Sequence, residues 1–194
     1  MGESLPLSTI HDAVLGFLRG RDDAAVFGAQ AVNAYARQPR MTQDVDILST
    51  SAEALADQLQ EELADRFRIA VRIRVVAGGG GYRLYQVRKP RNRHLVDVRS
   101  VDRLPACNRI GEVLVPVPPE LIRQKLASMV SRPHAPKGMT DMADLQRLLL
   151  AFPELKTADG EVADGLRAAG VEEKTMAAWY DLVAREIVPE EDDE

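Results

Sequence analysis

The amino-acid sequence predicts an α/β (α+β) fold, in which a mixed sheet with flanking helices is followed by a helical region. Two observations predict this class. Short apolar or alternating segments are interleaved with helical patterns up to about residue 117, and apolar residues at helical spacing continue without strands after it. We therefore expect a sheet-containing core over 1–117, a helical region over 118–188 and a disordered acidic tail over 189–194.

The elements of the first part follow from its hydrophobic patterns. Helices are indicated by apolar residues three or four positions apart, and strands by short apolar runs or by alternation. Pro39 ends the second helix. In chain order, these patterns predict a helix over 8–18, a strand over 24–27, a helix over 29–37, a strand over 45–48, a helix over 52–67, and strands over 70–76, 82–88, 94–99 and 112–117.

The remaining elements are helical. Pro118 and Pro119 mark the start of the first of these helices, because proline is favoured in the first helical turn. The glycines at 78–81 separate two strands and form either a hairpin turn or a flexible loop over a ligand. The predicted helices of the second part are 120–130, 141–152, 161–169 and 172–187.

Composition narrows the class of protein. The 194 residues suffice for one sizeable core, and 45% hydrophobic with 28% charged residues is typical of a globular protein. No apolar run approaches the roughly 20 residues of a membrane span, and no signal pattern opens the chain, so we expect no membrane contact. The single Cys107 excludes an internal disulfide and a multi-thiolate metal site, and we expect a reducing, cytoplasmic location.

The net charge of −5 is concentrated in the acidic tail, and one stretch of the chain is strongly basic. Residues 66–103 carry eleven Arg or Lys residues against only Asp97 and Asp102. Such an excess attracts phosphates, although charged protection of exposed strand edges explains it equally well.

Two carboxylates carry the main chemical prediction. Asp44 and Asp46 stand at positions i and i+2 beside a predicted strand, so their side chains should project from the same face. Two like charges so close repel each other unless a cation lies between them, and hard oxygen ligands suit Mg²⁺. The alternative is an exposed strand that carries two solvated acids.

Gly28 lies where a predicted strand runs directly into a helix. The first backbone N–H groups of a helix are unpaired and bind phosphate, and a residue without a side chain lets the phosphate approach. Together with the carboxylates, this turn would supply a phosphate cradle and a metal platform on adjacent strands.

These residues resemble the DNA polymerase beta superfamily of nucleotidyltransferases. That family has Gly-Gly or Gly-Ser at a strand-to-helix turn, a short helix, and then Asp-x-Asp or Asp-x-Glu in the next strand. Here Gly28-Ala29 and Asp44-Val45-Asp46 match, except that Ala29 lacks the hydroxyl of many relatives. The resemblance implies a third carboxylate from a later strand, and Asp97 stands in a suitable hydrophobic frame.

Two later segments resemble the abortive-infection toxin branch of minimal nucleotidyltransferases. Residues 118–127 match a helix that supplies a lysine, here Lys125, and residues 140–145 match an Arg/Lys-Asp-x-x-Asp-Leu helix start, with Thr140 in place of the basic residue. Lys125 would contact the triphosphate, or it is a surface lysine. Asp141 and Asp144 would position that lysine, or Thr140 and Asp141 cap a helix.

The resemblance implies a magnesium-dependent enzyme, with Mn²⁺ as an alternative ion, that moves a nucleoside monophosphate from a nucleoside triphosphate such as ATP to an acceptor hydroxyl. The basic stretch favours an RNA 3′ end over a protein side chain or a small molecule. The branch implies a toxin restrained by an antitoxin protein. The alternative is a non-catalytic nucleotide- or RNA-binding module. The implied metal and catalytic residues are Asp44, Asp46 and Asp97, and the implied nucleotide-binding residues are Gly28, Ala29, Thr42 and Lys125.

Overall fold

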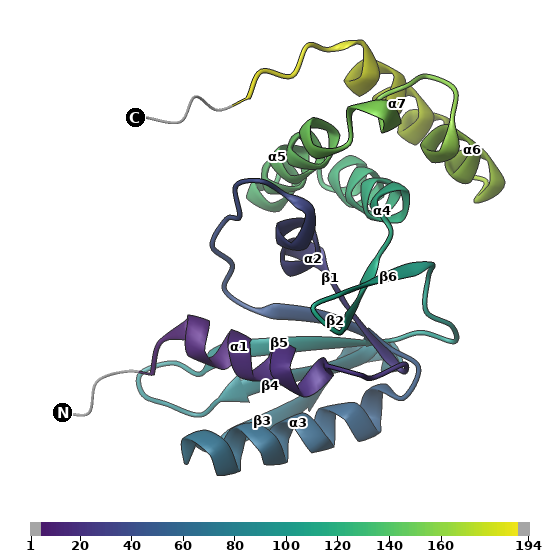
Figure 1. Ribbon diagram of the computed structural model, residues 1–194. Helices are drawn as coiled ribbons and strands as arrows, with labels where there is room; N and C mark the ends of the chain where they lie inside the picture. The colour runs from purple at the N-terminus through teal and green to yellow at the C-terminus, as the bar shows by residue number, and fades with distance from the viewer. Residues whose placement is uncertain (1–4, 190–194) are drawn as a thin grey trace. The chain divides into compact units, whose positions relative to one another are not determined.

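The computed structural model describes residues 5–189 and contains a seven-stranded mixed sheet in the order β3-β4-β5-β2-β1-β7-β6 (Figure 1). The strands are β1 (Ala24–Phe27), β2 (Val45–Ser49), β3 (Val71–Val75), β4 (Gly81–Gln86), β5 (Arg93–Ser100), β6 (Cys107–Ile110) and β7 (Val113–Pro116). The α-helices are α1 (Leu7–Leu18), α2 (Gly28–Tyr35), α3 (Ala52–Phe67), α4 (Pro118–Ser131), α5 (Pro136–Ala151), α6 (Glu161–Ala168) and α7 (Glu173–Ala184). Two short 3₁₀ helices complete the described part of the chain, η1 (Ala77–Gly79) and η2 (Pro153–Leu155).

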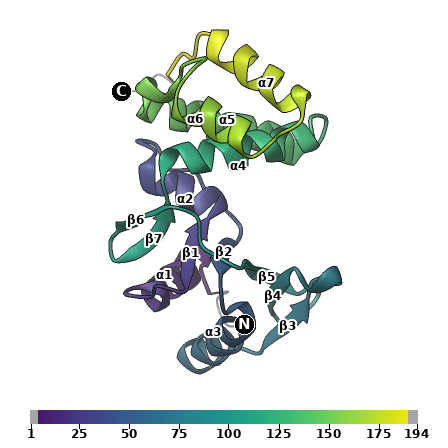
Figure 2. The same cartoon turned by 90° about the vertical axis from the view of Figure 1, so that its right-hand side faces the viewer.

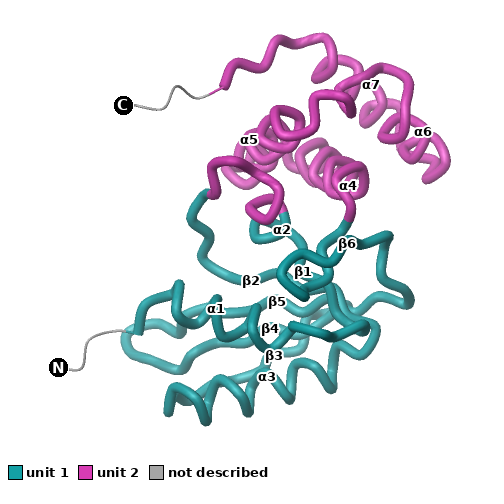
Figure 3. The backbone as a smooth tube through the Cα atoms, viewed as in Figure 1, with its two compact units in different colours: residues 1–31, 40–116 teal, residues 32–39, 117–194 magenta. Residues whose placement is uncertain are grey.

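The chain forms two compact units (Figure 3). Unit 1 comprises residues 1–31 and 40–116, and unit 2 comprises residues 32–39 and 117–194. The division after residue 116 lies one residue from the expected end of the core. Residues 32–39, which we expected in the core, group with the helical unit. The acidic residues 190–194, expected to be disordered, lie outside the described residues.

Unit 1 is built around the sheet, and α3 lies along one face of β3, β4 and β5 (Figures 1 and 2). The alternation of the strands explains this packing. Ile73, Leu84 and Val96 are opposite one another in register, and Leu84 and Val96 are fully buried, as is Leu59 of α3. The opposite face of the same three strands carries polar and charged side chains. The core of unit 1 therefore lies on the α3 side, and the other face of these strands is available for chemistry.

The strand directions bring the two halves of the expected site together. β2 is antiparallel to β1 and parallel to β5, so β2 lies between the strand that ends at Gly28 and the strand that carries Asp97. The expectation that the glycine turn and the Asp44-x-Asp46 pair occupy adjacent strands is confirmed.

Unit 2 is helical, and α4 packs against α5, α6 and α7. The last helix, α7, buries Trp179 and Leu182, which are 0% and 1% exposed. The helix expected to start at Asp141 instead starts at Pro136, so Thr140 and Asp141 lie inside α5 and the capping interpretation is wrong. Gly138 allows the earlier start, because a Cβ there would lie 2.0 Å from the carbonyl oxygen of Arg132.

Among residues 5–189, no helix combines the length and the apolar character needed to cross a membrane.

Candidate functional site

Gly28 forms the turn between β1 and α2, and it packs directly against the carboxylate of Asp46. The φ angle of Gly28 is +65°, a left-handed conformation that side chains other than glycine rarely adopt. A Cβ at Gly28 would lie 2.2 Å from Oδ2 of Asp46 and 2.9 Å from its Cγ. This position therefore requires glycine for two reasons: its backbone angle is left-handed, and the Asp46 carboxylate occupies the space where a Cβ would lie.

Asp46 and Asp97 are neighbours across the sheet. The register pairs Phe27 with Asp46, Asp46 with Asp97, and Asp97 with Arg83. Paired residues on neighbouring strands project from the same face, so both carboxylates belong to the face opposite α3. Asp97 is only 8% exposed, and its Oδ2 accepts a hydrogen bond from Nε of Arg83 at 3.2 Å. The Asp97 carboxylate raises the pKa of Arg83 above its ordinary value by charge attraction.

Asp44 contacts His94, and a β-bulge is the reason. His94 and Asp97 are three residues apart and would project from opposite faces of a regular strand. The register between β4 and β5 shifts at Leu84/Tyr85, which pairs His94 with Tyr85 and places His94 on the same face as Asp97. Nδ1 of His94 then lies 2.9 Å from Oδ2 of Asp44.

The remaining nucleotide-binding candidates of unit 1 lie beside these carboxylates. The hydroxyl of Thr42 donates a hydrogen bond to the backbone carbonyl of Asp44 at 3.1 Å, so Thr42 fixes the segment that leads into β2. Ala29 is buried in the first turn of α2 and is 7% exposed. A methyl group has no polar atom, so Ala29 could offer a phosphate only its backbone N–H, and its role as a nucleotide-binding residue stays a prediction.

The donor atoms of this site suit a hard divalent cation, but the side chains are not gathered around one point. In the part of the chain that the structure describes, no three His, Cys, Asp or Glu side chains are grouped as a metal site. Two of the carboxylates have other partners: Asp97 is paired with Arg83 and Asp44 with His94. Each partner occupies a carboxylate oxygen that a cation would otherwise use.

Lys125 lies in unit 2, and two aspartates hold its ammonium group. Its Nζ donates hydrogen bonds to Oδ1 of Asp141 at 2.9 Å and to Oδ2 of Asp144 at 2.7 Å. Lys125 is 8%, Asp141 2% and Asp144 0% exposed. The alternative that Lys125 is a surface lysine is therefore wrong, and the interpretation that Asp141 and Asp144 position it agrees with these contacts, whereas its contact with a triphosphate stays a prediction.

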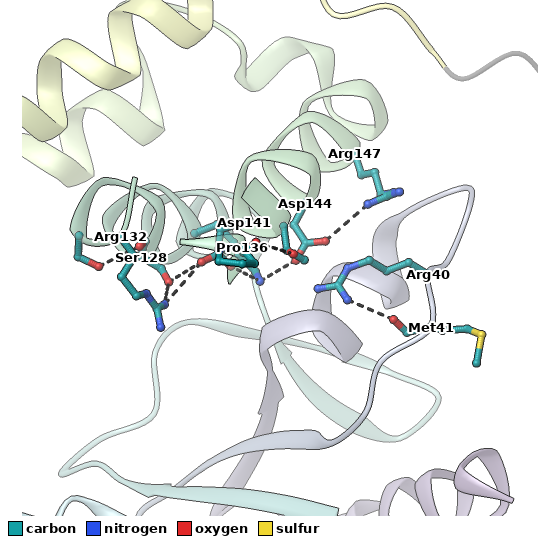
Figure 4. A network of polar contacts seen from close by, with 11 residues as sticks. Arg40, Met41, Ser128, Arg132, Pro136, Asp141, Asp144 and Arg147 are labelled. Carbon is teal, nitrogen blue, oxygen red and sulfur yellow. Dashed lines mark hydrogen bonds and ion pairs between the residues drawn. The ribbon is translucent and has the colours of Figure 1, made fainter. Parts of the chain in front are cut away.

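Further polar groups surround this buried cluster (Figure 4). The hydroxyl of Ser128 donates a hydrogen bond to Oδ2 of Asp141 at 2.7 Å, Arg132 lies 3.6 Å from the same carboxylate, and Arg147 lies 3.8 Å from Asp144. Three cationic side chains thus surround two buried carboxylates, which offsets the cost of removing those charges from water.

Two residues of the site were not predicted from the sequence, Arg83 and His94. For Arg83, the alternation of β4 could have revealed its face, but only the register shows that it is opposite Asp97. For His94, no sequence pattern indicates the β-bulge that places its side chain on the same face of the sheet as Asp97.

No protein-family model matches this sequence, and no curated protein shows significant sequence similarity to it. Solved structures are similar in fold. A putative nucleotidyltransferase from H. pylori has a TM-score of 0.54 at 12% identity, and the likeness covers 91% of this chain and 91% of that chain. The antibiotic-resistance factor ANT(2'')-Ia has a TM-score of 0.54 at 16% identity, over 84% of this chain and 89% of that chain.

The polyadenylate synthase of Megavirus has a TM-score of 0.52 at 10% identity. That likeness covers 89% of this chain but 38% of the synthase, so this chain spans less than half of its length. Together these likenesses show that the chain has the nucleotidyltransferase fold of the DNA polymerase beta type. None of these three structures is named as an abortive-infection toxin, so that finer resemblance stays a prediction.

Proposed function

We propose that this chain, which has the nucleotidyltransferase fold, transfers a nucleoside monophosphate from a nucleoside triphosphate to an acceptor hydroxyl. The single observation that carries the proposal is the packing of Asp46 against Gly28. This packing places the N-terminus of α2, where a phosphate could bind, next to one carboxylate of the Asp44/Asp46 pair. Asp97 is opposite Asp46 in the register of the sheet. A pure binding module has no need of that third carboxylate.

The donor atoms of these residues have the chemistry that a divalent ion prefers, and binding would require the carboxylates to turn toward one point. Asp44, Asp46 and Asp97 supply only carboxylate oxygens, the ligands that Mg²⁺ and Mn²⁺ prefer, and the last two occupy neighbouring strands. Asp44 and Asp46 would hold the ion that accompanies the nucleotide, and Asp97 would complete the site next to the acceptor. A bound Mg²⁺ would neutralise charge on the triphosphate and lower the pKa of the acceptor hydroxyl.

The chain's own groups would perform the remaining work. The first backbone N–H groups of α2, exposed by Gly28, would donate hydrogen bonds to the non-bridging phosphate oxygens. The acceptor oxygen would attack the α-phosphorus in line, the bond from that phosphorus to the bridging oxygen would break, and pyrophosphate would leave. Asp97 would accept the hydroxyl proton as the new phosphorus–oxygen bond forms.

Lys125 stays a prediction as a triphosphate contact. Its ammonium already donates to Asp141 and Asp144, so binding a phosphate would require it to exchange one carboxylate for the ligand.

We propose the 3′ end of an RNA as the acceptor, because the face that carries Asp46 and Asp97 also carries arginines, and a polyadenylate synthase is among the structures with this fold. Regulation by an antitoxin protein would follow if the resemblance to the abortive-infection branch holds.

The direct test is incubation of the purified protein with each radiolabelled nucleoside triphosphate, Mg²⁺ and total RNA. We expect one nucleotide to label RNA, and we expect chelation of the ion to abolish labelling. Asp46→Asn is the matched variant, since it removes one charge and keeps the shape of the side chain. Labelling that persists in Asp46→Asn or after chelation would contradict the proposal. A protein that binds nucleotide without labelling RNA, protein or small hydroxyl compounds would favour the non-catalytic module.

A further inference from the structure

We propose that the face of β3, β4 and β5 opposite α3 binds the single-stranded RNA that serves as acceptor, through Arg72, Arg74 and Arg99 and through the ring of Tyr85. This inference rests on the proposed function, and it assigns the acceptor to a defined surface of unit 1. We call this surface the acceptor face.

The register aligns the acceptor face with the catalytic carboxylates. One row across the strands reads Arg74, Arg83, Asp97 and Asp46, and the next reads Arg72, Tyr85 and His94. Neighbouring strands lie about 4.8 Å apart, so Arg74 and Asp97 are roughly 10 Å apart along their row. A single-stranded RNA bound over these arginines would therefore reach the carboxylates while it stays in contact with the same face of the sheet.

Edge protection explains only part of these charges. Arg72 and Arg74 belong to the edge strand β3, where positive side chains commonly prevent pairing with another chain. Arg83 and Arg99 belong to the inner strands β4 and β5, which have both edges paired. All four side chains are exposed. Their positions therefore describe a charged face that extends beyond the protected edge.

Two like charges are opposite each other on this face, and a bound anion would lie favourably beside them. Arg74 and Arg83 are directly opposite each other in register, and like charges in that arrangement destabilise a sheet. Asp97 pairs with Arg83, whereas Arg74 forms no ion pair with a carboxylate among residues 5–189. A phosphate bound between β3 and β4 would remove this repulsion.

Aromatic side chains on the same face favour a single strand over a duplex. The guanidinium carbon of Arg74 lies 5.7 Å from the centre of the Tyr85 ring, and the Tyr85 and His94 rings are 4.9 Å apart at 30°. His94 in turn contacts Asp44, so the Tyr85 and His94 rings lie in a row that ends at the Asp44 carboxylate. Unpaired bases stack on such rings, whereas the bases of a duplex are already stacked on each other.

The test is binding of a short, unstructured, 5′-labelled oligoribonucleotide, followed by fluorescence anisotropy at several salt concentrations. Nucleoside triphosphate is omitted and a chelator is present, so the readout does not depend on transfer. The double variant Arg72→Ala/Arg74→Ala removes two phosphate contacts. We expect weaker binding and a salt dependence whose slope decreases by about 1.4, from roughly 0.7 per contact on a single strand.

The ring is tested separately from the charges. Tyr85→Ala should weaken binding about tenfold with an unchanged salt slope, because stacking is lost and no charge is removed. Tyr85→Phe keeps the ring and should bind like the wild type. Arg19→Ala removes an exposed arginine from the C-terminal end of α1 and is the matched control, which should also bind like the wild type.

The outcomes separate this proposal from the proposed function. Wild-type affinity and slope in the double variant, an equal loss in Arg19→Ala, or tighter binding of duplex than of single-stranded RNA would overturn the acceptor face. If the variants behave as expected but RNA never receives a nucleotide, the acceptor face stands and RNA transfer fails. If RNA is labelled and the double variant leaves both binding and the KM for RNA unchanged, transfer stands and the acceptor face fails.

Discussion

Replacing Gly28 with alanine tests the local geometry on which the site depends. The substitution has two separable consequences, because φ at this position is +65° and because the new Cβ would lie 2.2 Å from Oδ2 of Asp46. The left-handed conformation alone costs roughly 1–2 kcal/mol for a residue with a Cβ. The contact with Asp46 cannot be tolerated, so the carboxylate must rotate away from the turn, and an off-rotamer side chain costs a further ~0.5–1.5 kcal/mol.

Gly20 provides the matched control within unit 1. Its φ is +73°, and no atom lies within 4 Å of a Cβ built there. Gly20→Ala should therefore lose only the conformational part, about 1–2 kcal/mol. Urea-induced unfolding followed by circular dichroism gives the free energy of unfolding of both variants. We expect Gly28→Ala to be the less stable of the two.

Activity should separate the two variants further. Gly20→Ala should transfer nucleotide at the wild-type rate, whereas Gly28→Ala should lose activity to about the extent of Asp46→Ala, because both lack a correctly placed carboxylate. If Gly28→Ala is as stable as Gly20→Ala and also keeps wild-type activity, the packing of Gly28 against Asp46 does not matter and the reasoning is refuted.

Three other substitutions test side-chain contacts of the structure. Lys125→Met should reduce the free energy of unfolding by about 3–5 kcal/mol in urea titrations, because Asp141 and Asp144 would be left buried with their main cation removed; a loss below 1 kcal/mol would contradict this. Arg83→Met should tighten the binding of Mn²⁺ measured by calorimetry, since Arg83 competes for Asp97, and unchanged affinity would contradict that competition. Hydrogen bonds from Arg21 lower the pKa of Asp23 below its ordinary value of 3.8. The ionised Asp23 carboxylate therefore stabilises the folded state above pH 3.8, and this stabilisation is lost as the pH falls through the lower, folded-state pKa. The stability difference between wild type and Asp23→Asn should therefore shrink with acidification, and a constant difference would exclude this linkage.

The sequence was enough to identify candidate site residues, but it did not predict which of their side chains contact one another. Local pattern was enough for the long helix 52–67, which has the expected bounds, and for β1, because a four-residue apolar run before a glycine has few alternatives. It also predicted that the glycine turn and the carboxylate pair occupy adjacent strands. Pairing register, in contrast, is a tertiary property. That Asp97 is opposite both Asp46 and Arg83 follows only from the strand order.

One strand was missed for an identifiable reason. β6 (Cys107–Ile110) lacks an apolar alternation, because it is an edge strand with Asn108 and Arg109 exposed. Its turn to β7 uses Gly111 and Glu112, both with positive φ, as a two-residue hairpin turn requires. Glutamate is uncommon at such a position, so the turn was not recognised from the sequence.

The early start of α5 was missed because Thr140 and Asp141 also fit the cap of a helix that begins at residue 141. Gly138 is required where the end of α4 approaches the start of α5. The extra turn places Asp141 and Asp144 one helical turn apart on the face that holds Lys125. The bulge near Tyr85 that brings His94 to Asp44 likewise has no local sequence pattern of its own.

Asp97 is proposed to complete the catalytic site of a nucleotidyltransferase, and the variant Asp97→Asn tests that role. The measurement is a pair: nucleotide titration by calorimetry in Mg²⁺, and single-turnover transfer to the acceptor found by labelling. We expect nucleotide affinity close to the wild type, because Asp44, Asp46 and the Gly28 turn are unchanged. The chemical step should fall by at least the factor of about 10²–10⁴ that a positioned base contributes. A variant that binds nucleotide and transfers it as fast as the wild type would place Asp97 outside the site and contradict the account.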